Sequence, residues 1–458
     1  MCSINLAING SFEQVKAMQQ ATIRRGTTES MYAVGKTWVS FSYLPITDKH
    51  APIQPYKSGE FTVWMNGFIS NYKELAEKYD IKLETNCDTE LLVKFLDKFD
   101  YYKLDELNGF FAVVVHYSRH VGNEWSCFTD RYGTKQIYTY KRDGITLISS
   151  EVKGILAVFP DIELDDVAVN EWKETLGVVT KNTIYKGIKR VAQLPMPTFT
   201  VRSTLSYEDA KRELSRLLHQ SFDRNKYDGE SGVYLSGGID SGLIAHWMRP
   251  EYSFSVDYVD PRFSEIELIK LNSTGIHHSI IVNRELADIY AQKTMLALDD
   301  LKAGSCYTNF AIAELASKFV QVVYSGAGGD EFFGGYPHRK NKDINDVVYR
   351  CDVGELTEVI DYGTLSHFEY DMEFLRAVLV VEDRMSGWHT METRYPLLDN
   401  DLVNFALSLP GEYLENKRIL KDVCGLHEDV VNGKKKGFSN PYFSNEQWVD
   451  FALENLKR

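Results

Sequence analysis

The sequence lacks the long apolar runs that membrane-spanning helices require. Its longest runs, residues 110–115 and 377–381, are far shorter than the roughly 20 residues that cross a bilayer. No basic segment followed by an apolar core opens the chain, so we expect no secretory signal. These absences predict a protein of the cytoplasm, a reducing compartment, with no membrane partner.

The six cysteines lack the CxxC and CxxH spacings of zinc sites, so we expect no structural zinc. Five of them are expected to be small buried side chains with free thiols. Cys2 differs, because a small side chain at position two permits removal of Met1. The freed α-amine, with a pKa of about 8, can then act as general base for the neighbouring thiol.

The chain has little positive charge relative to negative charge. Lys and Arg total 51 against 65 Asp and Glu, which gives a net charge of -14. Because nucleic-acid binding depends on neutralising phosphates, this balance argues against a nucleic-acid partner. A local basic stretch at residues 433–437 remains a candidate for contacting a nucleotide. The 458 residues, 44% of them hydrophobic, suffice for two or three domains.

Two blocks of different pattern follow one another along the chain. In the first block, short strands are predicted at 61–65, 110–116, 125–129, 145–149 and 198–201, with helices at 71–79 and 89–97. This pattern predicts a layered antiparallel α+β domain. A boundary is expected between the segment 195–203 and an amphipathic helix at 207–222. The predicted domains are therefore residues 2–203 and 204–458.

The second block alternates strands with helices. Strands are predicted at 232–235, 254–259, 279–282 and 320–324, and helices at 241–248, 264–273, 286–298 and 309–319. Alternation of this kind predicts a doubly wound parallel sheet, in which ligands bind beyond the carboxyl ends of the strands. From about residue 346 onward the pattern is mostly helical.

The first glycine turn of this block has the sequence Ser-Gly-Gly-Ile-Asp-Ser. Gly237 and Gly238 let the backbone approach an anion, and the N-terminus of the next helix directs N–H groups at it. Ser236 and Ser241 add hydroxyl donors. Asp240 would repel phosphate alone, so its presence implies a bridging Mg²⁺. For this hexapeptide alone, a tight turn with Asp240 near the helix N-cap remains the alternative.

A second glycine turn, Ser-Gly-Ala-Gly-Gly-Asp-Glu, also follows an apolar strand. It begins at Ser325 and Gly326 and ends at Asp330 and Glu331. Both turns belong to the same edge of the predicted sheet, so we expect them to form one metal–pyrophosphate site. Asp240 and Asp330 would hold the metal from two sides.

These turns resemble the pyrophosphatase-type loops of the asparagine synthetase family, and the resemblance extends over nearly the whole chain. Residues 392–399, Glu-Thr-Arg-Tyr-Pro-Leu-Leu-Asp, look like the acid–Arg–Pro–Asp signature of that family, and residues 435–438 like its basic loop. The resemblance implies contacts with ATP or its pyrophosphate from these residues: Ser236, Gly237, Gly238, Asp240, Ser241, Ser325, Gly326 and Lys435.

The same resemblance implies an adenylating enzyme, in which ATP and Mg²⁺ activate a carboxylate and ammonia attacks the adenylate. Asp240 and Asp330 would be the metal ligands. Glu331, Glu392 and Arg394 are the candidates for acting on the acceptor or nucleophile. The family also suggests a homodimer.

The first block resembles class II glutamine amidotransferase domains, around Asn66-Gly67, around Asp88, and at residues 107–111, 130–133 and 149–153. This implies an Ntn-hydrolase αββα sandwich, with Cys2 as the nucleophile that releases ammonia from glutamine. Asn66 and Gly67 would form the oxyanion hole. Asp88 would bind the α-amine of glutamine, and the ammonia would travel through a tunnel to the adenylate.

Four residues depart from the family pattern. Ser3 replaces a glycine, and Phe68 replaces a glutamate expected near the glutamine amine. The arginine expected to bind the glutamine α-carboxylate, a pair that contributes strongly to binding, is replaced in the segment 43–48, Tyr-Leu-Pro-Ile-Thr-Asp, which begins at Tyr43. Ala327 replaces an acid thought to act on the acceptor or nucleophile.

Three functions therefore remain in view. The leading hypothesis is a glutamine-dependent asparagine synthetase that uses aspartate. The alternative keeps adenylation but uses another carboxylate or nucleophile, with ammonia supplied directly and a weakened glutaminase. The third hypothesis is a protein without enzyme activity that binds a nucleotide or a partner protein. Asp240, Asp330 and Lys435 argue against this hypothesis.

Overall fold

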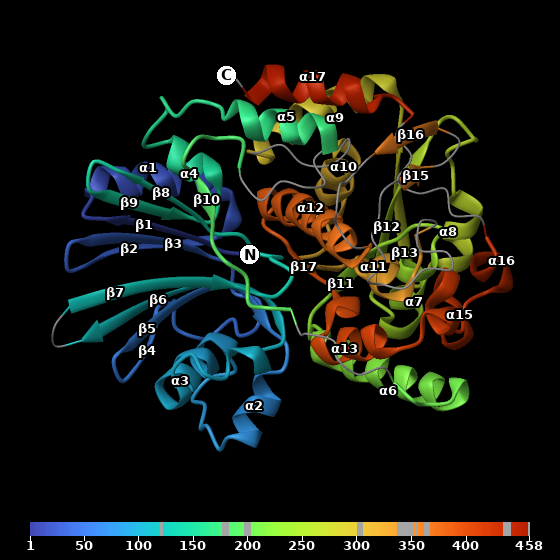
Figure 1. Ribbon diagram of the computed structural model, residues 1–458, viewed down its shortest axis with the longest axis horizontal. Helices are drawn as coiled ribbons and strands as arrows, with labels where there is room; N and C mark the ends of the chain where they lie inside the picture. Colours follow the sequence, from blue (N-terminus) through green and yellow to red (C-terminus); the bar gives the residue numbers. More distant parts are fainter. Residues whose placement is uncertain are drawn as a thin grey trace. The chain divides into compact units, whose positions relative to one another are not determined.

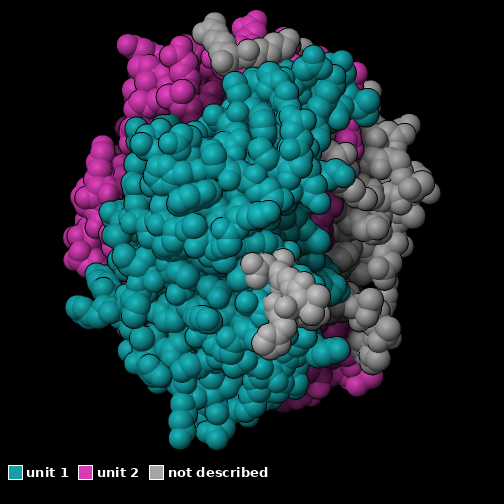
Figure 2. All heavy atoms as spheres, turned by 90° about the vertical axis from the view of Figure 1, so that its left-hand side faces the viewer, with its two compact units in different colours: residues 1–169, 181–196, 387–392 teal, residues 170–180, 197–386, 393–458 magenta. Residues whose placement is uncertain are grey.

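The computed structural model describes the chain except for residues 120–121, 176–182, 197–202, 300–305, 337–350, 354–355, 361–366, 434–440 and 457–458. The chain divides into two compact units, coloured separately in Figure 2. Unit 1 contains residues 1–169, 181–196 and 387–392, and unit 2 contains 170–180, 197–386 and 393–458. The predicted strand at 198–201 lies outside the described residues, and the boundary predicted at residue 203 stays a prediction. Within the described ranges, no helix has the length and apolar composition needed to span a membrane.

Unit 1 is built on two antiparallel sheets (Figure 1). The six-stranded sheet has the order β10 (Lys189–Arg190), β8 (Tyr138–Arg142), β9 (Ile145–Ser149), β1 (Ser3–Ile8), β3 (Thr37–Tyr43) and β2 (Thr28–Val34). The four-stranded sheet has the order β4 (Tyr56–Ser58), β5 (Phe61–Ile69), β6 (Gly109–Arg119) and β7 (Gly122–Thr129). Helices α1 (Phe12–Thr22) and α4 (Val152–Leu156) pack on the first sheet, and α3 (Asp88–Phe99) packs on the second beside α2 (Tyr72–Lys78).

Alternate residues of β5 supply two different cores. Trp64 packs with Ile4 and Phe41 in the core between the sheets, whereas Met65 packs with Leu92 of α3 in the outer core. A strand turns successive side chains to opposite faces, so one strand serves both layers. The expected αββα sandwich is confirmed. The next residue, Asn66, belongs to the inner face.

Unit 2 contains a five-stranded sheet with the order β13 (Ile276–Val282), β12 (Tyr252–Tyr258), β11 (Ser231–Tyr234), β14 (Val322–Tyr324) and β17 (Glu392–Arg394). The pairs β11–β12, β12–β13 and β11–β14 are parallel. The chain moves outward from β11 to β13 and then returns to β14 on the other side of β11. The loops after β11 and β14 therefore leave the sheet at a topological switch point, where doubly wound folds bind ligands. The predicted parallel sheet is confirmed.

Helices make up most of the remainder of unit 2. They are α6 (Tyr207–Asn225), α7 (Ile239–Met248), α8 (Ile266–Asn272), α9 (Arg284–Ala297), α10 (Tyr307–Ala316), α11 (Gly329–Phe333), α12 (His367–Trp388), α13 (Asn400–Ser408), α14 (Gly411–Leu414), α15 (Arg418–Val423), α16 (Glu428–Val431) and α17 (Asn445–Leu456), while α5 (Asp166–Thr175) begins in unit 1. The helical pattern predicted after residue 346 is correct from α12 onward. Before it, however, β15 (Cys351–Val353) and β16 (Leu356–Ile360) pair antiparallel. The Thr, Val and Ile of β16 favour an extended strand.

Candidate active sites

Cys2 lies buried directly before β1, in the core between the two sheets of unit 1. Its backbone N–H donates to Asn66 Oδ1 at 2.8 Å, and its carbonyl oxygen accepts from Arg25 Nε at 3.0 Å. The Arg25 guanidinium also pairs with the Glu151 carboxylate at 2.8 Å, and both side chains are buried. Three segments far apart in the sequence therefore fix the backbone that carries the thiol.

Asn66 and Gly67 of β5 fit the expected oxyanion hole. Asn66 accepts from Cys2 through its oxygen, and its buried Nδ2 has no hydrogen-bond partner among the residues that the structure describes. This leaves an unused amide donor on the side chain that accepts from the Cys2 N–H. Gly67 has φ of 135°, and a Cβ there would lie 1.9 Å from the Phe110 carbonyl oxygen. Only glycine fits this position.

The pocket beside Cys2 is small and acidic. Its cavity measures about 20 Å³, room for about one water molecule. It is lined by Cys2, Tyr43, Leu44, Ile46, Thr47, Gln54, Met65, Gly67, Cys87, Asp88, Thr89 and Glu392. Asp88 and Glu392 contribute carboxylates, and within the described part of the chain this lining includes no Lys, Arg or His. Glutamine is far larger than one water molecule, so its entry requires these side chains to move.

Asp88 is held rigidly at the start of α3. Its carboxylate accepts from the backbone N–H groups of Ile69 at 2.8 Å and Thr89 at 3.1 Å. These bonds join the end of β5 to the helix that covers it. The predicted amine-binding carboxylate therefore lines the same pocket as the predicted nucleophile.

Electrostatics at Cys2 favour the neutral thiol. Burial raises the pKa of Cys2, and the nearby positively charged amino terminus offsets part of that rise. With Met1 attached, the nitrogen of Cys2 is a peptide N–H, which cannot accept a proton. The amine belongs instead to Met1, where burial lowers its pKa. Removal of Met1 would convert this N–H into the amine that a terminal nucleophile needs.

In unit 2, the hydroxyl groups of Ser236 and Ser241 form hydrogen bonds within the first glycine loop. Ser241 Oγ accepts from the Ser236 N–H at 3.1 Å and lies 3.0 Å from Ser236 Oγ. Ser236 Oγ in turn accepts from the Gly238 N–H at 3.1 Å. The Gly237 N–H donates to a carboxylate oxygen of Glu265 at 3.2 Å, so an internal anion stands where a phosphate oxygen was expected.

The second glycine loop connects β14 to α11. The Ser325 N–H donates to the Arg394 carbonyl at 3.0 Å, and Ser325 Oγ donates to the Glu382 carboxylate at 3.1 Å. Gly328 has φ of 98°, which favours glycine. Two hydrogen bonds hold Glu331, from the Gly328 N–H at 3.1 Å and from the Tyr336 hydroxyl at 2.6 Å.

The two glycine loops lie against each other, as the sequence predicts. A Cβ at Gly329 would lie 2.2 Å from Asp240 Oδ1, and one at Gly326 would lie 2.9 Å from the Ser241 nitrogen. The glycines therefore allow a contact that any side chain would prevent. This contact brings Asp240 close to the loop that carries Asp330.

Lys417 joins the two predicted metal ligands. Its Nζ forms an ion pair with Asp240 Oδ2 and another with Asp330 Oδ1, the latter at 2.6 Å. Burial lowers the pKa of Lys417, but Asp240 and Asp330 outweigh it and raise the pKa above its ordinary value. Lys417 lies at the end of a short 3-10 helix, Glu415–Lys417, and 177 residues separate it from Asp240. No local pattern in the sequence marks it.

This arrangement suits one small cation and a phosphate chain. The carboxylates of Asp240 and Asp330 both reach a single ammonium group, so both can reach a single ion. Within the described ranges, no group of three or more His, Cys, Asp and Glu side chains gathers around a metal position. Two carboxylates plus substrate phosphates are a usual ligand set for Mg²⁺, so these residues fit that ion.

The remaining candidates have other surroundings. Glu392 lines the Cys2 pocket in unit 1, whereas Glu331 lies in unit 2, where burial and then the Asp330 charge raise its pKa. Arg394 is buried and donates to the carbonyls of Asn225 at 3.0 Å and Lys226 at 3.3 Å, which gives it a structural role. Lys435 lies outside the described residues.

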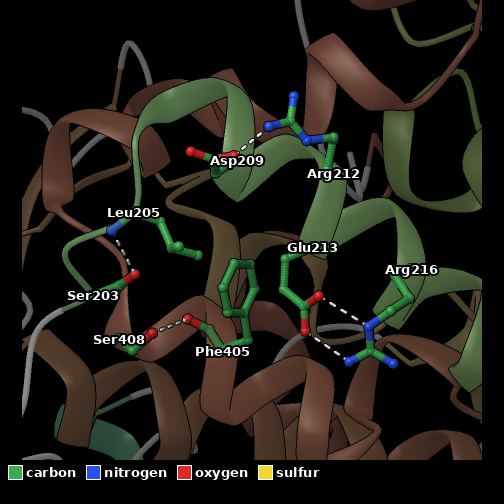
Figure 3. Close-up of a pocket in the computed structure, with 8 residues that line it drawn as sticks. All are labelled: Ser203, Leu205, Asp209, Arg212, Glu213, Arg216, Phe405 and Ser408. Atoms are coloured by element: carbon green, nitrogen blue, oxygen red, sulfur yellow. Dashed lines mark hydrogen bonds and ion pairs between the residues drawn. The ribbon is translucent and has the colours of Figure 1, made fainter.

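A larger pocket of about 720 Å³ opens elsewhere in unit 2, beside α6. It is lined by Ser203, Leu205, Asp209, Arg212, Glu213, Arg216, Phe405 and Ser408. Figure 3 shows that its charged groups pair with each other, Asp209 with Arg212 and Glu213 with Arg216. None of the predicted site residues lines this pocket, so it does not compete with the glycine loops as the nucleotide site.

Two protein families match the chain. Residues 1–204 match the glutamine amidotransferase domain family. Residues 213–353 and 364–457 match the asparagine synthase family, which accounts for about half of the chain. The two matches correspond to the two resemblances carried by the sequence motifs.

Curated relatives give the same result. A putative glutamine-hydrolysing asparagine synthetase of Methanocaldococcus jannaschii is 27% identical over 392 residues, 73% of this chain and 76% of the relative. Glutamine-hydrolysing asparagine synthetase 1 of Bacillus subtilis is 28% identical over 358 residues, 71% of this chain and 56% of the relative. Among solved structures, the glutamine phosphoribosylpyrophosphate amidotransferase of B. subtilis matches with a TM-score of 0.31 and 12% identity, over 72% of this chain and 77% of that one.

Proposed function

Because the chain belongs to the asparagine synthase family and carries a glutamine amidotransferase domain, we propose that it is a glutamine-dependent, asparagine synthetase-like ligase. ATP would adenylate the side-chain carboxylate of aspartate. Ammonia released from glutamine at Cys2 would then form the amide, with release of AMP and pyrophosphate. The family implies an ATP-dependent amidotransferase ligase, and the proposal adds the acceptor, the products and Mg²⁺.

The meeting of Asp240 and Asp330 at Lys417 Nζ carries this proposal. Burying two carboxylates side by side is costly unless a cation pairs with them. The chain keeps both acids in the first turns of the helices that follow two adjacent parallel strands, and the glycines of the intervening loops permit close approach. A bound metal ion and a triphosphate would account for the presence of both acids next to the glycine loops. A turn with only a structural role requires neither acid.

In the adenylation step, a carboxylate oxygen of the acceptor bonds to the α-phosphorus of ATP, and the bond from that phosphorus to the pyrophosphate breaks. Mg²⁺ held by Asp240 and Asp330 would neutralise negative charge on the phosphates. Lys417 and Lys435 would stabilise the negative charge of the departing pyrophosphate. Ammonia then bonds to the acyl carbon, AMP leaves, and the nitrogen loses a proton.

In the amino-terminal pocket, the Cys2 sulfur would attack the carboxamide carbon of glutamine. The free amine of Cys2 would take the thiol proton and pass it to the departing ammonia. Asn66 Nδ2 and the Gly67 N–H would stabilise the oxyanion, and Asp88 would pair with the α-amine of the substrate. Water then releases glutamate from the thioester. The buried donor at Asn66 supports this assignment.

The decisive experiment measures pyrophosphate release with aspartate, ATP and magnesium, comparing glutamine with ammonium as nitrogen source. Mass spectrometry of the products should find asparagine and AMP in amounts equal to pyrophosphate. ATP turnover without asparagine would contradict aspartate as the acceptor. Absence of pyrophosphate release with every carboxylate would contradict the ligase assignment.

The alternative, an amide ligase that uses another carboxylate or nucleophile and takes ammonia directly, is favoured by two observations. The described lining of the Cys2 pocket offers no cation for the glutamine α-carboxylate, and the segment expected to carry an arginine contributes Tyr43, Leu44, Ile46 and Thr47 to it instead. Ala327 cannot act on the acceptor as an acid would. A screen of carboxylates by pyrophosphate release separates the two proposals, and the strongest signal with aspartate would count against this one.

The partners that follow from the proposal are small molecules: ATP, aspartate or another carboxylate, and glutamine or ammonia. We propose a cytoplasmic enzyme, with no nucleic-acid or membrane partner, that forms a homodimer. The excess of 65 acidic over 51 basic residues supports the exclusion of nucleic acid. Light scattering of the purified protein tests the dimer.

A further inference from the structure

Asn272, the last residue of α8, lies buried against the first glycine loop. Its Nδ2 donates to the carbonyl oxygen of Ser236 at 3.2 Å and to that of Gly238 at 3.1 Å. The side chain is 2% exposed. Carbonyl oxygens only accept hydrogen bonds, so the two N–H donors of the amide, and not its oxygen, face the loop.

These two bonds fix the direction of peptide groups in the loop. A planar trans peptide points its carbonyl oxygen and the following N–H in opposite directions. Holding the Ser236 carbonyl therefore turns the Gly237 N–H away from Asn272, and holding the Gly238 carbonyl does the same for the Ile239 N–H. The Gly237 N–H already donates to the Glu265 carboxylate at 3.2 Å, so this side of the loop meets an anion.

The space around Asn272 leaves its amide little room to turn. A Cβ at Gly242, the fourth residue of α7, would lie 2.6 Å from Asn272 Oδ1 and 2.8 Å from Nδ2. Glycine at this position lets the amide sit directly against the helix that follows the loop. The loop, α7 and α8 are thus joined at one buried side chain.

We propose that Asn272 is a positioning residue for the nucleotide, which holds the carbonyls of the first loop away from the phosphates so that its N–H groups face them. This inference rests on the proposed ATP chemistry of unit 2. Without the amide, either peptide group can rotate and present a carbonyl oxygen, which repels a phosphate. Loss of Asn272 should therefore weaken ATP binding more than it slows the chemical step.

Substitution Asn272→Asp tests this with almost no change of shape, because it replaces the donor nitrogen with an acceptor oxygen. At pH 8 the Kd of ATP with magnesium, measured by isothermal titration calorimetry, should rise about tenfold as two hydrogen bonds are lost. The KM for ATP should rise with it, and kcat should change less. Burial raises the pKa of a carboxyl group, so at pH 6 partial protonation of the introduced carboxyl should restore a donor and recover affinity.

Thr274→Val is the matched control, because Thr274 Oγ1 donates from the neighbouring turn to the Ala245 carbonyl of α7 at 3.0 Å and does not touch the loop. Its Kd for ATP should equal that of the wild type. If Asn272→Asp does not fold, Asn272→Ala removes the donor without burying a charge and decides the question.

Wild-type affinity in the Asn272 variant, or an equal loss in Thr274→Val, would overturn the proposal. Wild-type protein that binds no ATP would instead contradict the proposed function.

Discussion

The Cys2 pocket of unit 1 and the paired glycine loops of unit 2 differ in how far their residues depart from the family pattern. In unit 1, Asn66 accepts a hydrogen bond from the Cys2 N–H, whereas Tyr43 and Phe68 differ from the residues that the family resemblance leads us to expect at a glutamine site. In unit 2, the two acids proposed to hold the ion meet at Lys417, and Ala327 is the departure from the family pattern noted in its sequence. Under the proposed function, more of the departures from the family pattern fall at the site of nitrogen supply than at the site of carboxylate activation.

The charges of the two sites also differ. In unit 2, Lys417 pairs with two acids, and Glu265 accepts from a loop amide. The pocket of unit 1 has two carboxylates, Asp88 and Glu392, and a thiol whose pKa burial raises. Under the proposed function, Mg²⁺ and phosphate would take over contacts that Lys417 and Glu265 provide in unit 2, whereas glutamine would have to rearrange the small pocket of unit 1.

Replacing the predicted nucleophile, Cys2, should produce the largest effect on the glutamine-dependent rate. It should also distinguish the glutamine reaction of unit 1 from the ATP reaction of unit 2. Cys2→Ala should abolish pyrophosphate release with glutamine, by about 10⁴-fold or more, because the attacking atom is gone. Release with ammonium should stay within about twofold of the wild type. Cys127→Ala, at another thiol of unit 1, serves as control and should change neither rate. Loss of the ammonium-dependent rate in Cys2→Ala would contradict the assignment of ammonia release to unit 1 and of carboxylate activation to unit 2.

Removing a metal ligand should affect both nitrogen sources equally. Asp240→Asn leaves Lys417 buried with one acid and should lower pyrophosphate release by about 10³-fold. The exposed Asp288 of α9, replaced in the same way, should have no effect. The same assay with glutamine and with ammonium checks both. Unchanged turnover would remove Asp240 from the mechanism.

Introducing an arginine into the Cys2 pocket tests whether the lack of a cation there limits glutamine binding. Tyr43→Arg should lower the KM for glutamine by about tenfold, because a charge-assisted pair with the α-carboxylate becomes available. Tyr43→Phe removes only the hydroxyl and should not gain affinity. Glutamate release at varied glutamine concentration measures the effect. A KM that does not fall would show that Tyr43 does not limit glutamine binding.

The smallest effect is expected at the internal anion of unit 2. Glu265→Gln should tighten ATP binding by about fivefold, because the Gly237 N–H loses a charged competitor and the phosphates lose a repelling neighbour. Glu267→Gln is the matched control, because Glu267 lies exposed in the first turn of α8, the helix that Glu265 immediately precedes. Calorimetric titration with ATP and magnesium compares the two. Weaker binding in Glu265→Gln would mean that the carboxylate supports the loop instead of competing with phosphate.

Much of the fold follows from local pattern. In unit 2 the alternation of apolar strands and helices located β11, β12 and α7 within about two residues of their observed bounds, because strand and helix periods differ clearly. In unit 1, β9 was predicted at its observed bounds, but no strand was predicted at β1, β2 or β3. Strand β1 carries buried Ser3 and Asn5, whose polarity hides a core strand. Asn5 is satisfied by hydrogen bonds to Thr22 and Ser40, which only folding brings near.

The sequence by itself identified the short segments that carry the candidate chemical groups: Cys2, the Asn66-Gly67 pair of β5, and the two glycine loops with the acids that follow them. Each is a short segment that can be recognised from its own residues, although the contacts that join these segments form only in the folded chain. Tertiary structure alone decided that Lys417 lies between Asp240 and Asp330, that Asn272 holds the first loop, and that Glu392 lines the Cys2 pocket. The physical reason is that hydrogen bonds and charge pairs depend on distance in space, and 177 residues of chain separate Lys417 from Asp240.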